Sequence, residues 1–207
     1  MEVVRNLAEF VIFSEQNLQG AFFDIFCERN MLEHFGRLLN LKNRSVAIQL
    51  IQTTSILLAN IKTETKKFYL LCHPFLTKLV EFDHNFFDEE LVDIFVSFVK
   101  SLALMLNKDS VRFFYNHKQT HFPLLTVSQQ FANHPETMVR NAVRIINLTV
   151  FSLNDPSINQ DIIADVPFCT TFANLACLLR DKVCKGIDQS FSNQTFLKTK
   201  NQPQKNI

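Results

Sequence analysis

The chain has 207 residues, 47% of them hydrophobic and 20% charged, which is enough to form a domain with a substantial core. Its net charge of +1 argues against a general nucleic-acid-binding surface. It contains three glycines and no tryptophan, against 22 phenylalanines. Because tight hairpins and phosphate-binding loops depend on glycine, this composition favours an all-α fold.

Three predicted helices are long and strongly periodic. The run at 45–60 starts at Ser45, a favourable N-cap, and the run at 88–107 opens with an aspartate and two glutamates, which the helix dipole favours. The run at 135–154 has Pro135 at its first helical position. Shorter helices are expected at 2–14, 20–29, 31–41, 64–72, 75–82, 110–116, 122–132, 157–164 and 168–186.

The long helices recur at a regular interval. Each ends in an asparagine, a residue that tolerates the left-handed cap conformation, and Asn60, Asn107 and Asn154 are spaced 47 residues apart. A period in the mid-forties is typical of HEAT and armadillo units, so the spacing predicts an armadillo/HEAT-like α-solenoid. The alternative is an irregular helical bundle. We expect one domain over 1–188 and a disordered polar tail over 189–207.

Overlaying the long helices at this interval aligns three sets of residues on one face. The sets are Val46, Asp93 and Arg140; Leu50, Ser97 and Arg144; and Thr53, Lys100 and Asn147. Stacked repeats would form a polar strip that becomes more basic towards its end. Two interpretations stay open, a solvated face and a partner-binding groove. The candidate partner-binding residues are Lys100, Arg140, Arg144 and Asn147.

The stretch "FFYNHKQTHFPLL" at 113–125 invites a search for a metal or nucleic-acid site. His117 and His121 have helical metal-ligand spacing, but no second ligand pair is near in sequence. The phenylalanines are spread over every apolar face, so core packing explains them better than base stacking. We expect a helix end, a polar turn and a new helix, anchored in the core by the aromatic and leucine side chains Phe113, Phe114, Phe122 and Leu124.

Catalytic motifs are absent from the sequence. It contains no nucleophile elbow, zinc-protease motif or phosphate-binding loop, so we expect no enzymatic activity and no cofactor.

The five cysteines lack a CxxC pair, and the N-terminus does not resemble a signal peptide, which predicts a reduced, cytoplasmic protein. Three of them fall on roughly one face of the helix at 168–186, which predicts buried thiols: Cys169, Cys177 and Cys184.

Two uncharged runs could be mistaken for membrane spans. The run at 45–61 is too polar and the run at 166–179 too short to cross a bilayer. Both are predicted to be buried helices, and any membrane association is expected to be peripheral.

Several motifs in order resemble a known family. "FDIFCERNM", "IQLIQTTSILLANI", "DEELVDIFVSFVKSLALMLN", the pair "FFYN" and "FPLL", and "NHPETMVRNAVR" are similar to the FPL domain. That domain opens the endosomal-maturation family, which includes the C-type lectin domain family sixteen member A-like proteins. Because family members are usually longer, we expect a fragment or a minimal form.

The resemblance implies an armadillo-like domain and a protein-interaction scaffold in endosome maturation, lysosomal trafficking, autophagy and mitophagy. It implies a cytoplasmic protein, peripheral on endosomal and lysosomal membranes. Expected partners are trafficking or tethering proteins, a Rab-type GTPase or a ubiquitin ligase, and no nucleic acid. It also makes the exposed tip at His117, Lys118 and His121 a candidate contact.

Two alternative functions remain from other classes. The chain could be a component of a ubiquitin ligase, although it lacks the closely spaced Cys and His ligands of a RING domain. It could also be a peripheral lipid-binding module.

Overall fold

The computed structural model describes most of the chain. The described residues are 2–17, 20–82, 88–115, 122–156, 159–160, 169–170, 172–173, 176–177 and 179–186. Their regular secondary structure is entirely helical, which confirms the all-α prediction. The contacts divide the chain into two compact units, residues 1–162 and 163–207. The predicted tail lies outside the described residues, and the predicted boundary at residue 188 stays a prediction.

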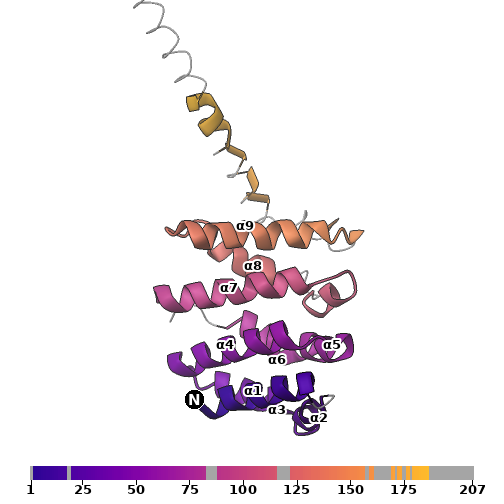
Figure 1. Ribbon diagram of the computed structural model, residues 1–207. Coiled ribbons are helices and arrows are strands. Elements are labelled where there is room, and N and C mark those ends of the chain that lie inside the picture. Colours follow the sequence, from indigo (N-terminus) through magenta and orange to yellow (C-terminus); the bar gives the residue numbers. More distant parts are fainter. Residues whose placement is uncertain are drawn as a thin grey trace, which may run out of the picture. The chain divides into compact units, whose positions relative to one another are not determined.

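The first unit is built from layers of helices (Figure 1). The lowest layer in the figure contains α1 (Glu2–Asn17), α2 (Ala21–Glu28) and α3 (Met31–Leu39). The next contains α4 (Arg44–Asn60), α5 (Glu64–Cys72) and α6 (Pro74–Val80). Above them lie α7 (Glu89–Met105), the 3₁₀ helix η2 (Ser110–Phe113), α8 (Pro123–Gln130) and α9 (Thr137–Ser152).

The long helices contact one another in chain order. α4 packs on α1, α7 packs on α4, and α9 packs on α7, so the three periodic helices are spatial neighbours. A second row of contacts joins α3 to α6 and α6 to α8. The regular spacing in the sequence therefore corresponds to adjacent layers in space.

Two of the predicted helix starts are wrong. α4 begins at Arg44 because the Asn43 side chain accepts a hydrogen bond from the Val46 backbone N–H, which places Ser45 inside the helix. α9 begins at Thr137 rather than Pro135, after an extended Glu136. The predicted start at Asp88 is confirmed as an N-cap, since its carboxylate accepts a hydrogen bond from the Leu91 N–H at 3.0 Å.

The three asparagines that suggested the repeat have different roles. Only Asn154 adopts the predicted left-handed conformation, with a φ of 50°. Asn60 is the last residue of α4, and its side chain donates to the Ile56 carbonyl. The Asn107 side chain instead accepts from the N–H groups of Asp109 and Ser110. That turn leads into η2, so the α-helix predicted at 110–116 is a short 3₁₀ helix.

The core of the lower layers contains a row of phenylalanine rings. Phe23 contacts Phe26, Phe26 contacts Phe35, and Phe35 contacts Phe75, with ring centroids about 6 Å apart in each pair. All four side chains are buried, and they come from α2, α3 and α6. Aromatic packing thus joins the two lower layers.

Most of the described residues of the stretch at 113–125, which are 113–115 and 122–125, are part of the core, as predicted for three of the four anchoring side chains. Phe114, Phe122 and Leu124 are buried. Phe113 is 41% exposed and makes an edge contact with Phe68, so its predicted burial is wrong. As the last residue of a single 3₁₀ turn, it reaches the rim of the core rather than its interior.

A largely buried ion pair also connects the lower layers. The Lys66 ammonium lies 2.6 Å from a carboxylate oxygen of Glu15, and their side chains are 15% and 7% exposed. The Thr63 hydroxyl donates to the other carboxylate oxygen at 2.6 Å. Burial alone would raise the pKa of Glu15, but the hydrogen bonds from Lys66 and Thr63 outweigh it and lower the pKa below its ordinary value.

Gly20 fits closely beside this pair. Its φ of 81° lies in the left-handed region, and a Cβ at this position would collide with the Lys66 ammonium. The turn between α1 and α2 therefore requires glycine for its backbone conformation and for its lack of a side chain.

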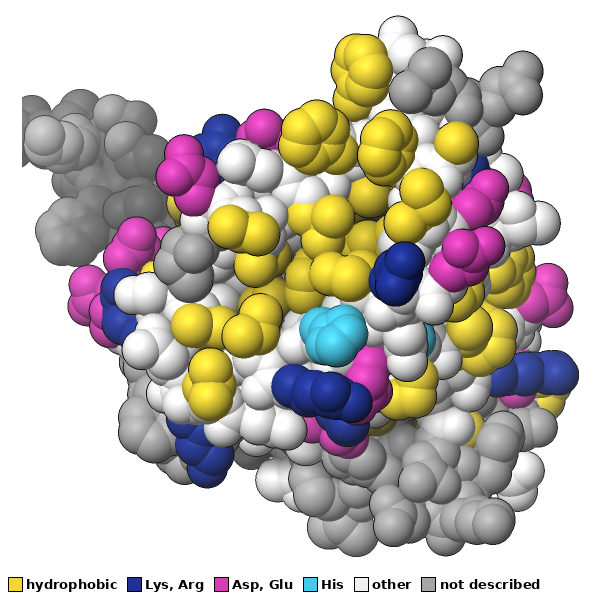
Figure 2. Space-filling model, turned by 90° about the horizontal axis from the view of Figure 1, so that it is seen from below, with side chains coloured by type: hydrophobic (Ala, Val, Ile, Leu, Met, Phe, Trp, Pro, Cys, Tyr) yellow, Lys and Arg dark blue, Asp and Glu magenta, His cyan; other side chains and the backbone are white. Residues whose placement is uncertain are grey.

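The lowest layer leaves an apolar surface uncovered. Figure 2 shows hydrophobic side chains gathered on the end of the first unit that carries α1 to α3. Large exposed hydrophobic residues of α1 and α2 are Val3, Phe10, Phe13, Phe22 and Ile25.

The second unit was predicted to contain a buried helix, and its described residues contradict this. They are helical where assigned, but all of them are exposed. The predicted burial of Cys169, Cys177 and Cys184 is accordingly wrong. No helix in the described part of the chain is long and apolar enough to span a bilayer.

The Glu15–Lys66 pair predicts a stability change with a distinctive pH dependence. Replacing Lys66 with methionine leaves a buried carboxylate without its cation, which should lower the free energy of unfolding at pH 7 by roughly 2–4 kcal/mol. In the native protein the pKa of Glu15 is lowered, so its contribution is present at neutral pH and is lost as the pH falls through the folded pKa. In the variant, the Lys66 hydrogen bond no longer opposes the effect of burial on the Glu15 carboxylate. Protonation of this carboxylate at acidic pH should therefore restore part of the lost stability. Urea unfolding at several pH values measures both effects.

Lys67→Met is the matched control. Lys67 pairs with Glu64, whose side chain is 71% exposed, so its loss should change stability by no more than about 1 kcal/mol. Equal losses of stability in the two variants would show that the Glu15–Lys66 pair stabilises the fold no more than the exposed pair does.

Candidate functional site

A surface groove runs across three long helices, α1, α4 and α7. Its volume is about 660 Å³, and α4 and α7 supply most of its lining. The α4 residues are Gln49, Gln52, Ser55 and Ile56. The α7 residues are Asp93, Ile94, Ser97, Phe98 and Ser101. One residue of α1, Arg5, completes the groove.

The lining combines polar and apolar side chains and carries little charge. Its amide and hydroxyl groups can both donate and accept hydrogen bonds. Several are engaged with their own helix, since Ser55 donates to the Ile51 carbonyl and Ser101 to the Ser97 carbonyl. The side chain of Gln52 is exposed and forms no hydrogen bond with the described residues. The groove therefore offers hydrogen-bonding groups that an incoming polar chain could use.

The two charged residues of the groove differ in their contacts. Arg5 donates to Glu9 at 2.9 Å, so its charge is balanced within α1. Asp93 is exposed, and no ion pair joins it to the described residues. The groove is thus expected to favour a cation near Asp93.

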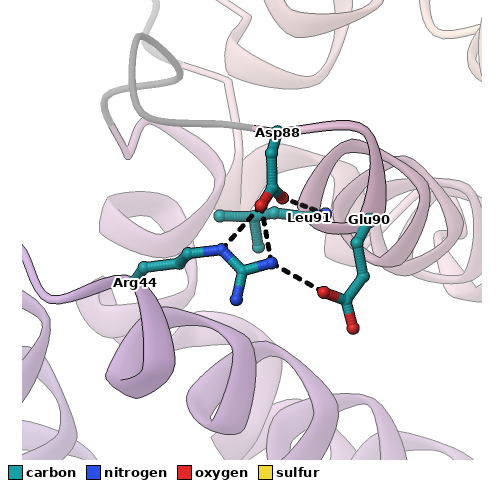
Figure 3. A network of polar contacts seen from close by, with 4 residues as sticks. All are labelled: Arg44, Asp88, Glu90 and Leu91. Atoms are coloured by element: carbon teal, nitrogen blue, oxygen red, sulfur yellow. Dashed lines mark hydrogen bonds and ion pairs between the residues drawn. The ribbon is translucent and has the colours of Figure 1, made fainter.

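A polar network connects α4 with the N-terminus of α7 (Figure 3). Arg44, the first residue of α4, lies 2.6 Å from oxygens of both Asp88 and Glu90. The other oxygen of Asp88 caps α7 by accepting from the Leu91 N–H, so one carboxylate serves both purposes. This network sets the start of α7 relative to the start of α4, and with it the alignment of the groove walls.

The network also changes the ionisation of its members. The pKa of Asp88 is lowered, first by the Leu91 N–H and then by the Arg44 guanidinium. The same contacts, led by the hydrogen bond to Glu90, raise the pKa of Arg44. All three side chains remain substantially exposed, so salt will screen their attraction.

The groove does not present a recognisable catalytic arrangement. Its described lining contains neither histidine nor cysteine, and Asp93 is its only carboxylate. Among the described residues, no group of three His, Cys, Asp or Glu side chains is placed to hold a metal ion. The chemistry available in this groove is hydrogen bonding, apolar contact and one negative charge.

The polar strip predicted from the sequence is not formed. Leu50 and Thr53 are each only 1% exposed, because these positions of α4 point into the packing between layers. Asn147 is half-buried and accepts a hydrogen bond from the Ser128 hydroxyl of α8. The predicted alignment therefore mixes solvent-facing residues with core residues.

Arg140 was the most prominent cation of that strip, and its guanidinium is engaged locally. It donates to the carbonyl oxygens of His134 and Pro135 and to the Thr137 hydroxyl. These contacts stabilise the turn before α9. The Asp93–Arg140 pair suggested by the alignment is not among the ion pairs of the described residues.

The remaining predicted contacts have mixed outcomes. Arg144 is exposed and donates to Asn141, whereas Lys100 is half-buried. The tip at His117, Lys118 and His121 lies outside the described residues. A role for any of these residues in partner binding stays a prediction.

Asp93 and Ser97 were in the aligned sets, but the other groove residues were missed because the wrong interval was used. The N-caps of α4 and α7, Asn43 and Asp88, are 45 residues apart rather than 47. An alignment on these caps would place Gln52 level with Ser97, and both line the groove. The capping asparagine and aspartate were visible in the sequence, so this signal was available.

Comparison with protein families gives one match over most of the first unit. The sequence matches the FPL family, described as "Uncharacterised conserved protein", over residues 4–151. The matched range includes all the described groove residues.

Several curated proteins are similar to the chain. It is 36% identical to Protein CLEC16A of Mus musculus and of Homo sapiens, over 94% of this chain and 19% of each relative. It is 32% identical to Protein TRANSPARENT TESTA 9 of Arabidopsis thaliana, over 84% of this chain and 21% of the relative. The chain thus spans about a fifth of the length of these relatives. No solved structure matches it.

The Arg44 network predicts a measurable shift in ionisation. Arg44→Gln should move the NMR titration of the Asp88 carboxylate to higher pH, but not fully to its ordinary value, because the Leu91 N–H still donates to it. Since the folded pKa of Asp88 is lowered, its stabilising contribution is present at neutral pH and is lost as the pH falls through that pKa.

Arg5→Gln provides a control, since it removes an exposed arginine that pairs only with Glu9 among the described residues. It should leave the Asp88 titration unchanged. If Arg44→Gln also leaves it unchanged, the helix cap alone lowers the pKa and the ion pair is absent in solution.

Proposed function

The chain belongs to the FPL family, and we propose that it is a non-enzymatic protein-interaction scaffold acting in endosome maturation, lysosomal trafficking, autophagy and mitophagy. The proposed partners are trafficking or tethering proteins, a Rab-type GTPase or a ubiquitin ligase. The proposed location is the cytoplasm and the surface of endosomal and lysosomal membranes. The family membership and the chemistry of the groove support the proposal together.

We also infer that the layers of the first unit are armadillo- or HEAT-like repeats. Three observations support this inference: the order of contacts along α1, α4, α7 and α9, the second row through α3, α6 and α8, and the mid-forties spacing of the N-caps. Such repeats present extended surfaces, which suits a protein that binds other proteins.

The observation that carries the proposed function is the groove itself. It runs across α1, α4 and α7, and its lining combines amide and hydroxyl groups with the apolar side chains of Ile56, Ile94 and Phe98. An extended peptide offers a backbone N–H and C=O at each residue, which amide side chains can pair with. The groove is therefore best suited to an extended segment of a partner protein.

The unpaired charge refines the expected ligand. Asp93 lies in the groove without an ion-pair partner among the described residues, and the acidic Asp88 and Glu90 lie at the start of the same helix. A lysine or arginine in the bound segment would be attracted to this end. Because Asp88 and Glu90 share Arg44, Asp93 should contribute most of the preference.

Blocking the groove should remove the partners. Ser97→Arg and Gln52→Arg each place a long side chain into the groove without changing a buried residue, so the fold should survive. In cells, proximity labelling by either variant should enrich endolysosomal tethering proteins at least about tenfold less than the native chain does, as expected when a central contact is lost. Circular dichroism and thermal unfolding would verify the fold.

Arg144→Glu is the matched control, because Arg144 is exposed on α9 and lies outside the groove lining. It should retain the enrichment. Loss with Arg144→Glu and retention with the groove variants would move the interface to α9. If the native chain enriches no endolysosomal protein, the proposed cellular role fails, whatever the groove binds.

A further inference from the structure

The lower end of the first unit in Figure 1 exposes a contiguous apolar surface. Val3, Phe10 and Phe13 recur along one face of α1 and are 77%, 61% and 56% exposed. Phe22 and Ile25 of α2 are 44% and 50% exposed. We call these five residues the α1–α2 patch. At roughly 100 Å² for each phenylalanine, the patch exposes on the order of 400–500 Å², within the range of the largest apolar patch of a typical monomer, which is often functional.

The patch is continuous across two helices. The rings of Phe10 and Phe22 lie 6.4 Å apart, so the side chains of α1 and α2 meet rather than pointing in separate directions. The Ser14 hydroxyl accepts a hydrogen bond from the Phe22 N–H, which fixes the start of α2 against α1. Figure 2 shows this end of the unit with charged side chains around its hydrophobic centre.

The patch lies at the end of the row of long helices, and this position indicates which element would cover it. α4 contacts a long helix on each side, α1 and α7, and α7 likewise contacts α4 and α9. α1 packs on α4 and α2, and its buried residues are Ala8, Val11 and Ser14. Its patch lies on a different face, and no other long helix of the described chain packs there. A helix laid across α1 and α2 would continue the same layered packing.

The charges around the patch favour a basic occupant. Glu2, Asp24 and Glu28 are exposed and have no ion-pair partner among the described residues. Arg5 is balanced by Glu9, which leaves Arg29, the C-cap of α2, as the opposing cation. The rim is therefore acidic overall. It would repel an anionic membrane, and it would repel a second copy that presents the same rim.

We propose that the α1–α2 patch docks an amphipathic helix of a partner protein whose apolar stripe is flanked by lysine or arginine. The apolar stripe covers Phe10, Phe13 and Phe22, and the basic flanks face Asp24 and Glu28. This is the helix-in-groove mode of recognition, with charge setting the specificity. This proposal does not depend on the groove across α1, α4 and α7, which suits an extended segment.

Two synthetic helical peptides test the proposal. Both carry leucine at i, i+3, i+4, i+7 and i+11, and the stripe is flanked by lysine in one and by glutamate in the other. Fluorescence anisotropy with the full chain should show the lysine peptide binding at least about tenfold more tightly, with an affinity that falls as salt rises. The combined change Asp24→Lys and Glu28→Lys should reverse this preference.

Surface variants distinguish binding at the patch from nonspecific hydrophobic binding. Phe10→Asp with Phe13→Asp should weaken binding of the lysine peptide about tenfold or more, and these exposed positions should tolerate the change. Met138→Asp is the control, because Met138 is 80% exposed on α9, and it should leave binding unchanged. Circular dichroism of each variant confirms that it is folded.

Three results would overturn the proposal. If neither peptide binds, or both bind alike, the patch does not select a basic helix. If sedimentation shows a dimer that Phe10→Asp with Phe13→Asp dissociates, the occupant is a second copy. If vesicles of phosphatidylcholine and phosphatidylserine retain the native chain but not this variant, the occupant is a membrane. Failure of this test leaves the groove proposal standing, because the groove variants leave the patch intact.

Discussion

The central constraint on this structure is that α7 must be buried on most of its circumference. It packs against α4 on one side and α9 on the other, and eight of its residues are buried. One narrow stripe, which includes Asp93 and Ser97, remains in contact with solvent. Because the neighbouring helices approach closely on both sides of that stripe, it becomes the wall of a groove. The packing of the core and the candidate binding surface therefore follow from the same helix.

Two ion pairs connect α1 and α4 to other helices in physically different ways. Glu15 and Lys66 join α1 to α5 where both side chains are largely buried, so water competes little with the contact. Arg44 and Asp88 join α4 to α7 at the surface, where water and salt compete with the contact. The first pair stabilises a chain connection around Gly20. The second pair contributes less to the free energy of unfolding. It fixes the start of α7 relative to α4, because Asp88 is both the cap of α7 and the ion-pair partner of Arg44.

Much of the fold was predictable from local sequence, and the binding surface was not. Asp88 with its two glutamates, and Pro123 at the start of α8, are local signals that do not depend on the rest of the chain. The register between helices depends on side chains that meet in space. Asn60, Asn107 and Asn154 look alike in the sequence, but neighbouring backbone groups give each a different hydrogen bond. Similarly, Leu50 and Thr53 share a helical face with polar positions in an alignment, yet both lie inside the packing.

The layered packing has a consequence for how the chain folds and for how its folding could be followed. Most principal contacts link a helix to the same or the adjacent layer, so we expect layers to form and unravel stepwise from an end. The chain has no tryptophan and only two tyrosines, Tyr69 in α5 and Tyr115 just after η2. Each tyrosine thus belongs to a different layer. Substituting either one with phenylalanine leaves a single tyrosine, whose emission, excited at wavelengths that phenylalanine does not absorb, reports on one layer alone.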